Sequence, residues 1–303
     1  MHSEAGKGVV AMVCACLIWG FSPLYYKLLE HIPPLEILAH RTVWSFVIFL
    51  CVITLQRRLG DLRRVLGAPR RAGIVLLAAM SISVNWFCFI YSIQVGRAVE
   101  AALGYYIFPL VAVLFGWIFF REALGRVQGV AVALAVLAVS MLTYGFGVAP
   151  WIALVVAITF GFYGVIKKRL DAGPVVSVTA EVALLAPVGL IILAVVHGQG
   201  GGHFGQDAFE SGMLVFSGLI TAAPLMLFSY AARRVRLSTV GLLQYINPTA
   251  QFFCAVVIFG EPFTFWHKLA FGLIWAGLAL YSASSLRQER AARRAAIAAS
   301  TPV

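Results

Sequence analysis

The chain has 303 residues, of which 61% are hydrophobic and 12% are charged, and its mean hydropathy is +0.93. Soluble domains carry about twice that charged fraction, so the composition excludes a soluble globular protein and predicts a helical protein with many membrane spans. The net charge of +11 would suit nucleic-acid binding only if the basic residues shared one folded surface, and they are scattered over short turns and tails.

Ten apolar stretches are long enough to cross a bilayer, because a spanning helix needs about 20 apolar residues. In chain order they are 8–29, 36–55, 73–94, 98–120, 127–146, 150–166, 175–196, 212–232, 237–259 and 266–286. Several of the turns between them are too short to hold a domain. We therefore expect an all-α membrane protein with ten transmembrane helices and no extramembrane domain.

The stretch 97–122 returns 139 residues later as 236–261, with seven identical residues among 26 aligned positions. The identities include one proline near the middle of each stretch, Pro109 and Pro248. Proline removes a helical hydrogen bond, so we expect both helices to be interrupted there. Apolar composition alone does not explain this number of matches, and the chain reads as two copies of one unit.

A weaker repeat relates the first helices of the two halves at a spacing of 141 residues. The matched pairs are Gly20 and Gly161, Phe21 and Phe162, Lys27 and Lys168, and Leu29 and Leu170. We expect one five-helix repeat at 1–146 and a second at 147–303, which ends in a basic tail. Five spans in each half force the second half to insert upside down. Inverted repeats of this kind predict a substrate site near the bilayer midplane and transport by alternating access.

The basic residues predict the orientation. With the N-terminus in the cytoplasm, 19 of the 23 Lys and Arg residues fall on the inner side, six of them in the loop 57–71. The four that remain are Lys27, Arg41, Arg97 and Lys268. We expect a multi-pass membrane protein with both termini in the cytoplasm.

Three amides on the ninth span, Gln244, Asn247 and Gln251, recur on one face of a helix. Amides that face lipid are costly, so the side chains line a cavity or bond to other helices. We favour a cavity wall for the stripe as a whole. The predicted substrate-binding residues are aromatic or amide side chains near membrane depth: Trp19, Asn85, Trp86, Tyr105, Tyr106, Tyr163, Gln244, Tyr245 and Asn247. Trp19 fits an interfacial belt equally well.

Charged and titratable groups at membrane depth are the candidates for coupling or charge pairing. They are Lys27, His40, Arg41, Glu100 and Glu181. Arg41 fits snorkelling, a pair with Glu36, or binding of a substrate carboxylate. Glu181 fits an ion pair, a proton carrier or a partner for a substrate amine. Glu100 also fits a surface glutamate beside Arg97. We expect Lys27, Arg41 and Glu181 to be shielded from lipid.

No catalytic motif, Walker loop or metal-ligand spacing is present, and the five cysteines all lie in apolar runs. We expect no enzyme activity, no cofactor and no metal. The expected partners are a small-molecule substrate, membrane lipid, and a proton or another coupling ion, without nucleic acid; the oligomeric state stays open. The alternative is a membrane enzyme or lipid-handling scaffold that uses His40, Arg41 and the glycine-rich loop after His197. A channel is disfavoured, because bulky aromatic side chains would block an aqueous path.

Several motifs resemble one transporter group. They are WGFSPLYYK in the first helix, PPLEILAHRTVWS at the second, VEAALGYYIFPL in the fourth, and RLSTVGLLQYINPT followed by FGEPF at the ninth. These residues are similar to the RarD group, sometimes labelled chloramphenicol-sensitivity proteins, of the EamA-type drug/metabolite transporter superfamily. The resemblance covers the whole chain. It implies ten helices in inverted repeats in the inner membrane of a bacterium. It also implies carrier-mediated movement of small organic molecules, commonly export of amino acids or related metabolites.

Overall fold

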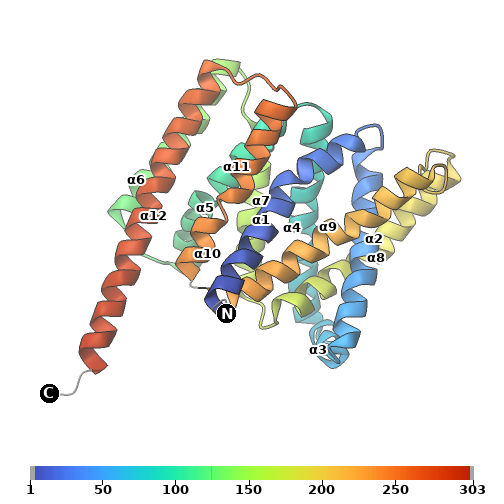
Figure 1. Ribbon diagram of the computed structural model, residues 1–303, viewed down its shortest axis with the longest axis horizontal. Coiled ribbons are helices and arrows are strands. Elements are labelled where there is room, and N and C mark those ends of the chain that lie inside the picture. The colour runs from blue at the N-terminus through green and yellow to red at the C-terminus, as the bar shows by residue number, and fades with distance from the viewer. Residues whose placement is uncertain (1–3, 124, 236, 301–303) are drawn as a thin grey trace.

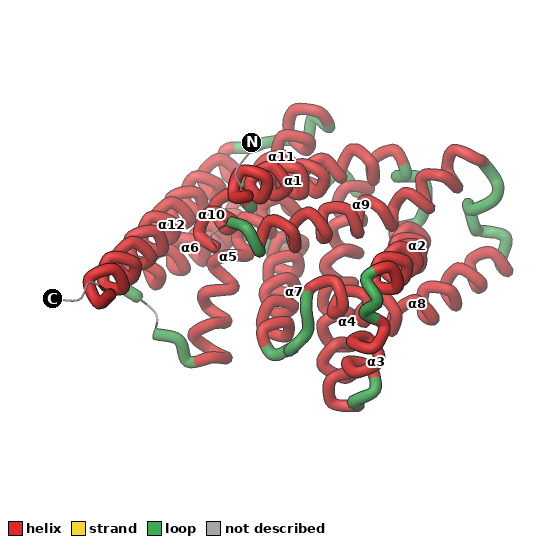
Figure 2. Tube along the Cα trace, turned by 60° about the horizontal axis from the view of Figure 1, so that its bottom comes forward, coloured by secondary structure: helices red, strands yellow, loops and turns green. Residues whose placement is uncertain are grey.

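A computed structural model describes residues 4–123, 125–235 and 237–300, and this part of the chain is almost entirely helical (Figures 1 and 2). In chain order the elements are α1 (Glu4–Leu28), α2 (Pro34–Leu55), α3 (Leu59–Leu66), α4 (Pro69–Gln94), α5 (Ala98–Phe120), α6 (Arg126–Phe146), α7 (Trp151–Lys168), α8 (Pro174–Gly198), α9 (Ala208–Ala232), α10 (Leu237–Leu243), α11 (Ile246–Phe253), the π-helical segment η1 (Cys254–Ile258) and α12 (Phe265–Ser300).

Among the described residues, nine helical stretches are long and apolar enough to cross a membrane. They coincide, within a few residues at each end, with the first nine spans expected from the sequence. The tenth expected span, 266–286, lies within α12, which is not one of the nine. α12 lies against α6, as both views show (Figures 1 and 2).

The arginine-rich loop contains a short helix, α3, that the sequence did not reveal. Val65 packs into a small apolar cluster with Ile53 of α2 and Val176 of α8, whereas Arg64 points outward with 74% of its side chain exposed. The helix therefore lies flat against the bundle, with its arginines in solvent. It lies at the bottom of Figure 1, the same end as the start of α1 and the end of α12.

α1 continues through Pro23 without a break. The proline cannot donate a hydrogen bond to the carbonyl of Trp19, and the hydroxyl of Ser22 donates to that oxygen instead at 2.7 Å. A neighbouring side chain thus satisfies the backbone group that the proline leaves open.

The expectation that both repeat prolines interrupt their helices is wrong for the first one. α5 runs without interruption from Ala98 to Phe120, with Pro109 inside it. The ninth span does break, between α10 and α11 at Gln244 and Tyr245, and becomes π-helical after Phe253. The two spans differ directly after the proline: Thr249 follows Pro248 and donates its hydroxyl to the carbonyl of Tyr245 at 2.6 Å, whereas Leu110 follows Pro109.

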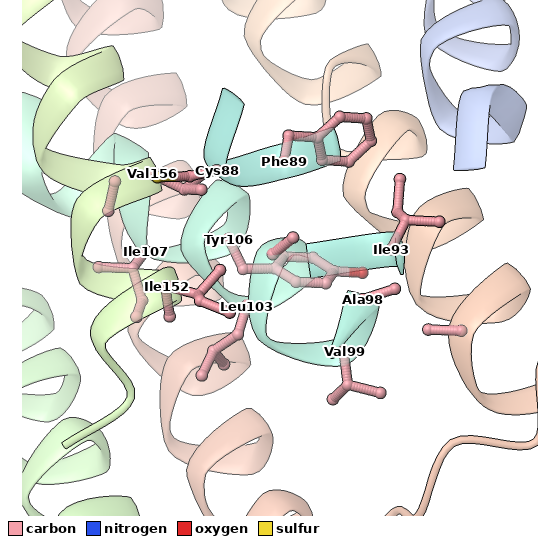
Figure 3. Packing of buried hydrophobic residues seen from close by; sticks show 14 of the residues in the cluster. Cys88, Phe89, Ile93, Ala98, Val99, Leu103, Tyr106, Ile107, Ile152 and Val156 are labelled. Carbon is pink, nitrogen blue, oxygen red and sulfur yellow. The ribbon is translucent and has the colours of Figure 1, made fainter. Parts of the chain in front are cut away.

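The main apolar core forms around the first half of α5. Side chains from α4, α5 and α7 meet there, among them Phe89, Leu103 and Ile152 (Figure 3). Gly104 brings the α5 backbone against α7, because a methyl group at its Cα would lie 2.7 Å from the carbonyl oxygen of Ala153. This close packing holds the polar side chains of α4 and α5 in fixed positions.

Candidate functional site

Arg41 lies two turns inside α2 and is only 4% exposed. Its Nε donates to Oγ1 of Thr221 on α9 at 2.7 Å, and its Nη1 donates to the hydroxyl of Tyr26 on α1 at 2.9 Å. The guanidinium carbon lies 3.9 Å from the centre of the Trp86 ring on α4. Four helices therefore meet at one cation, and every group that contacts it is neutral.

A polar pair adjoins this cation on the side of α5 and α7. The hydroxyl of Tyr105 donates to Oδ1 of Asn85 at 2.8 Å, and Nδ2 of Asn85 donates to the carbonyl of Val156 at 2.8 Å and to Thr159 at 3.2 Å. Asn85 is fully buried, whereas Trp86 and Tyr105 keep part of their rings accessible. The structure thus joins Asn85 to Tyr105, and it places the neighbouring Trp86 against Arg41.

Glu36, considered from the sequence as a partner for Arg41, is engaged elsewhere. Its two oxygens accept from the backbone N–H of His203 at 2.8 Å and contact Nδ1 of the same histidine at 2.9 Å. The loop after α8 is thereby fastened to the start of α2. The sequence did not reveal this pair, because sequence spacing does not show that the loop folds back onto α2.

Glu181 forms a second buried polar cluster, between α7 and α8. Its carboxylate pairs with Nζ of Lys167 at 2.6 Å and accepts from the hydroxyls of Ser177 and Tyr163, each at 3.1 Å. Glu181 is 3% exposed. Of the three roles considered for this carboxylate, the structure shows the ion pair. The burial expected for Arg41 and Glu181 is confirmed.

Glu100 lies at a different place, beside a cavity of about 250 Å³ lined by residues that include Glu261 and His267. Nε of Arg97 donates to Glu100 at 2.6 Å. Glu261 accepts hydrogen bonds from the first two amides of α5, those of Ala98 at 2.7 Å and Val99 at 2.8 Å. Burial raises the pKa of Glu261, and the two backbone bonds and the charge of Lys27 oppose that rise.

The amide stripe of the ninth span does not form one continuous helical face. Gln244 lies at the break, half-buried, without a side-chain hydrogen bond to any described residue. Asn247 and Gln251 lie on α11 and bond to each other at 3.0 Å, beside the close approach of α11 to Gly20 of α1. This bond joins two residues of the same helix, whereas the alternative drawn from the sequence was bonding to other helices.

The remaining predicted residues are spread over the bundle. Trp19 contacts Phe228 with ring centres 6.2 Å apart, and Tyr106 bonds to Thr249 at 2.6 Å and packs on the rings of α12. Tyr245, at the break of the ninth span, packs against the main core. His40 lies against Phe204, 5.0 Å between ring centres.

Lys27 differs from the other charged candidates because 38% of its side chain is exposed. It lies in the last turn of α1 and pairs with Glu30 at 2.5 Å. The sequence missed five residues of the polar clusters, which are Tyr26, Thr159, Lys167, Ser177 and Thr221. Tyr26 belongs to the distinctive WGFSPLYYK segment, which was a usable signal, whereas an isolated threonine in an apolar helix is not.

The model of the EamA-like transporter family matches residues 6–144 and 148–283. "Protein RarD" of Streptomyces exfoliatus is 41% identical over 96% of this chain and 93% of that protein, and "Protein RarD" of Escherichia coli (strain K12) is 35% identical over 95% and 97%. "Uncharacterized transporter YojE" of Bacillus subtilis (strain 168) is 39% identical over 96% and 99%. A solved crystal structure with 19% identity has a TM-score of 0.60 and covers 93% of this chain and 98% of its own, so the fold is shared.

Proposed function

Because the chain belongs to the EamA-like transporter family and is a RarD-type multi-pass membrane protein, we propose that it is a secondary carrier of the bacterial inner membrane. Its ten spans form two inverted five-helix repeats, and both termini face the cytoplasm. The carrier exports small organic metabolites, amino acids or related compounds, by alternating access between the two halves.

A pair of equivalent helix contacts carries this proposal. A methyl group on Gly20 of α1 would lie 2.5 Å from Cβ of Ala250 on α11, and one on Gly161 of α7 would lie 3.0 Å from Cγ1 of Val111 on α5. These are matched positions of the two sequence repeats, 20 with 161 and 111 with 250. Each half thus contributes one helix to each contact, as an exchange of the halves about a two-fold axis requires.

The ends of the two repeat helices are also alike. Arg121 and Gly260 both have left-handed backbones, with φ of 54° and 67°. In each case the following glutamate donates its N–H back to an equivalent carbonyl: Glu122 to Gly116 at 3.3 Å, and Glu261 to Ala255 at 3.0 Å. These repeated details support an inverted arrangement in which the two glutamates mark opposite ends of the molecule.

The contacts at those two ends join opposite halves. Lys168 of the second half pairs with Glu122 of the first at 2.6 Å and lies 4.2 Å from the centre of the Phe120 ring. Lys27 of the first half lies 5.8 Å from the ring centre of Phe259, the residue that the repeat matches to Phe120. Alternating access needs contacts of this kind, because one end must open while the other is closed.

The substrate path that we propose passes the buried polar groups around Trp86 and Tyr105, with the half-buried amide of Gln244 at the break of the ninth span. Aromatic faces and one amide suit an organic molecule with an apolar part, since stacking and hydrogen bonding can both contribute. Asn85 is bonded to Tyr105 and to α7, so it positions the ring.

Substrate-dependent counterflow in proteoliposomes tests the proposed function. Candidate metabolites are first found as compounds that raise the unfolding temperature of the purified protein, because a ligand of the folded state stabilises it by mass action. A carrier preloaded with unlabelled substrate then accumulates labelled substrate transiently. Saturable exchange is the expected result. Formation of a chemical product would identify an enzyme, and flux that neither saturates nor exchanges would identify a channel.

A further inference from the structure

Arg41 is a buried cation without an anion. Among the side chains that the structure describes, no carboxylate lies within ion-pairing distance of its guanidinium, and Glu36 on the same helix is bound to His203. Removing a cation from water costs several kcal/mol, and a buried cation is normally compensated by a paired charge. The three neutral groups around Arg41 orient it but leave its positive charge uncompensated.

The charge at the equivalent position of the second half, that of Glu181, is compensated by Lys167. Arg41 and Glu181 each stand seven residues after the prolines that begin their helices, Pro34 and Pro174. Tyr26 and Lys167, which contact them, stand 141 residues apart, the spacing of the helix repeat. The acid of the second half therefore has its counter-charge within the protein, whereas the arginine of the first half meets a neutral phenol.

The guanidinium is held in a way that leaves it able to accept a ligand. Nε and Nη1 each make one hydrogen bond to a hydroxyl, and Nη2 makes none to the described part of the chain. A guanidinium presents its N–H groups as a flat fork that matches the two oxygens of a carboxylate. The ring of Trp86 lies beside it at 3.9 Å and, being partly accessible, extends an apolar surface away from the charge.

We propose that Arg41 is the binding site for the carboxylate of the transported molecule, whose apolar part lies along Trp86 and Tyr105. The substrate class is thus an organic carboxylate with an apolar or aromatic side. The proposal rests on the proposed function, because the carboxylate supplies the counter-charge only while the substrate is bound. Thr221 and Tyr26 are positioning residues that fix the plane of the guanidinium.

The test compares matched carboxylate and amide probes on the purified full-length protein. The probes are 3-phenylpropionate, 4-methylpentanoate and N-acetylphenylalanine, each beside its primary amide, and binding is measured from tryptophan fluorescence and unfolding temperature. The wild-type protein is expected to bind at least one carboxylate at least tenfold more tightly than its amide. Arg41→Gln is expected to abolish that preference. Arg64→Gln, which removes an exposed arginine of α3, is expected to keep it.

Arg41→Lys is the second variant in case Arg41→Gln does not fold. It retains the charge but lacks the planar fork, so carboxylate affinity is expected to fall at least fivefold. The proposal is overturned if the wild-type protein binds none of the three carboxylates, if it binds their amides equally well, or if inorganic phosphate or chloride competes more strongly than any carboxylate. It is also overturned if the carboxylate preference survives in folded Arg41→Gln, or if folded Arg41→Lys binds the carboxylates as tightly as the wild-type protein.

The two proposals fail in different ways. If a carboxylate binds through Arg41 but shows no counterflow, the site stands and the carrier function fails. If counterflow occurs only with neutral or cationic compounds and is unchanged in Arg41→Gln, the carrier function stands and the carboxylate site fails.

Discussion

Lys167 and Glu181 tie α7 to α8 through an ion pair that is largely withdrawn from solvent. Each partner lowers the cost of burying the other, and the hydroxyls of Ser177 and Tyr163 complete the shell of the carboxylate. A pair of this kind specifies how two helices dock more than it adds net stability. Removal of one partner leaves the other charge without its counter-charge, whereas replacement of both by apolar residues leaves an apolar contact.

We predict that Glu181→Gln lowers the free energy of unfolding by about 2–4 kcal/mol, because Lys167 then keeps a charge with no acid beside it. The double variant Lys167→Met with Glu181→Leu is expected to recover most of that loss. Denaturation of the purified protein in detergent, analysed as a double-mutant cycle, gives the coupling. Losses that simply add in the double variant would show that the two charges do not stabilise one another.

Arg41 and Glu181 show what the sequence could and could not predict for single residues. Burial of Arg41 and Glu181 follows from their place inside apolar runs, because charge at membrane depth must be shielded from lipid. Their partners do not follow. Lys167 was counted with the cytoplasmic charges because it stands at a helix end, and only the fold shows that its side chain turns back to reach Glu181.

At the scale of helices, the C-terminal ends of α5 and of the ninth span use the same left-handed cap with different residues. Arg121 adopts φ of 54°, and Gly260 adopts φ of 67°. A side chain at such a position costs about 1–2 kcal/mol, which glycine avoids. The second repeat therefore carries the residue that this turn favours, and the first does not.

We predict that Arg121→Gly raises the stability of the protein by up to about 1 kcal/mol and that Gly260→Ala lowers it by about 1 kcal/mol. Unfolding temperatures of the purified variants check both. Gly212→Ala is the control, because Gly212 lies inside α9 with ordinary helical geometry and open space around it, and alanine there is expected to be neutral or favourable. A destabilised Arg121→Gly would mean that the arginine side chain matters more than the turn.

The contact between α1 and α11 depends on the absence of a side chain at Gly20. We predict that Gly20→Ala lowers stability by about 1–3 kcal/mol, because the new methyl group would lie 2.5 Å from Cβ of Ala250. Adding Ala250→Gly is expected to restore much of the loss. Gly164→Ala on α7, where no atom lies within 4 Å, is the matched control. Equal behaviour of Gly20→Ala and Gly164→Ala in thermal unfolding would contradict the close approach.

Hydropathy located the helices well because each span is a long apolar run, but it could not locate irregularities within them. Pro109 and Pro248 are matched in the sequence, and only the second lies in a broken span. The hydroxyl of Thr249, which follows Pro248, bonds to the carbonyl of Tyr245 beside the break, and a hydropathy profile does not register such a bond. α3 was missed for a related reason, since eight residues rich in arginine become a helix by packing Val65 on the bundle.

For the whole molecule, the repeat in the sequence predicted which helices are equivalent but not how they meet. α5 packs on α7 and α11 packs on α1, while α4 packs on α7 and α9 packs on α1. Each contact thus has a counterpart with the halves exchanged. The binding residues predicted from the sequence fall into several separate groups, because matching positions in a repeat does not give the rotation of each helix about its axis.

The inverted arrangement that we propose would place two similar glutamines on opposite sides of the membrane. Gln56 and Gln199 are the C-caps of α2 and α8, the second helix of each half, and both are exposed. The loop after α8 lies at the upper right of Figure 1, away from α3 at the bottom. If the six arginines of the loop 57–71 are cytoplasmic, Gln56 faces the cytoplasm and Gln199 faces outward.

We predict that a membrane-impermeant maleimide labels Gln199→Cys in intact cells and labels Gln56→Cys only after the membrane is opened. The background is a variant in which all five native cysteines, Cys14, Cys16, Cys51, Cys88 and Cys254, are replaced. Equal labelling of the denatured proteins controls for expression, and counterflow controls for folding. Labelling of both positions from the same side would refute the inverted repeat, because parallel halves put equivalent helix ends together. Labelling of Gln56→Cys alone would keep the inversion but reverse the whole molecule, which would mean that the arginine-rich loop does not set its orientation.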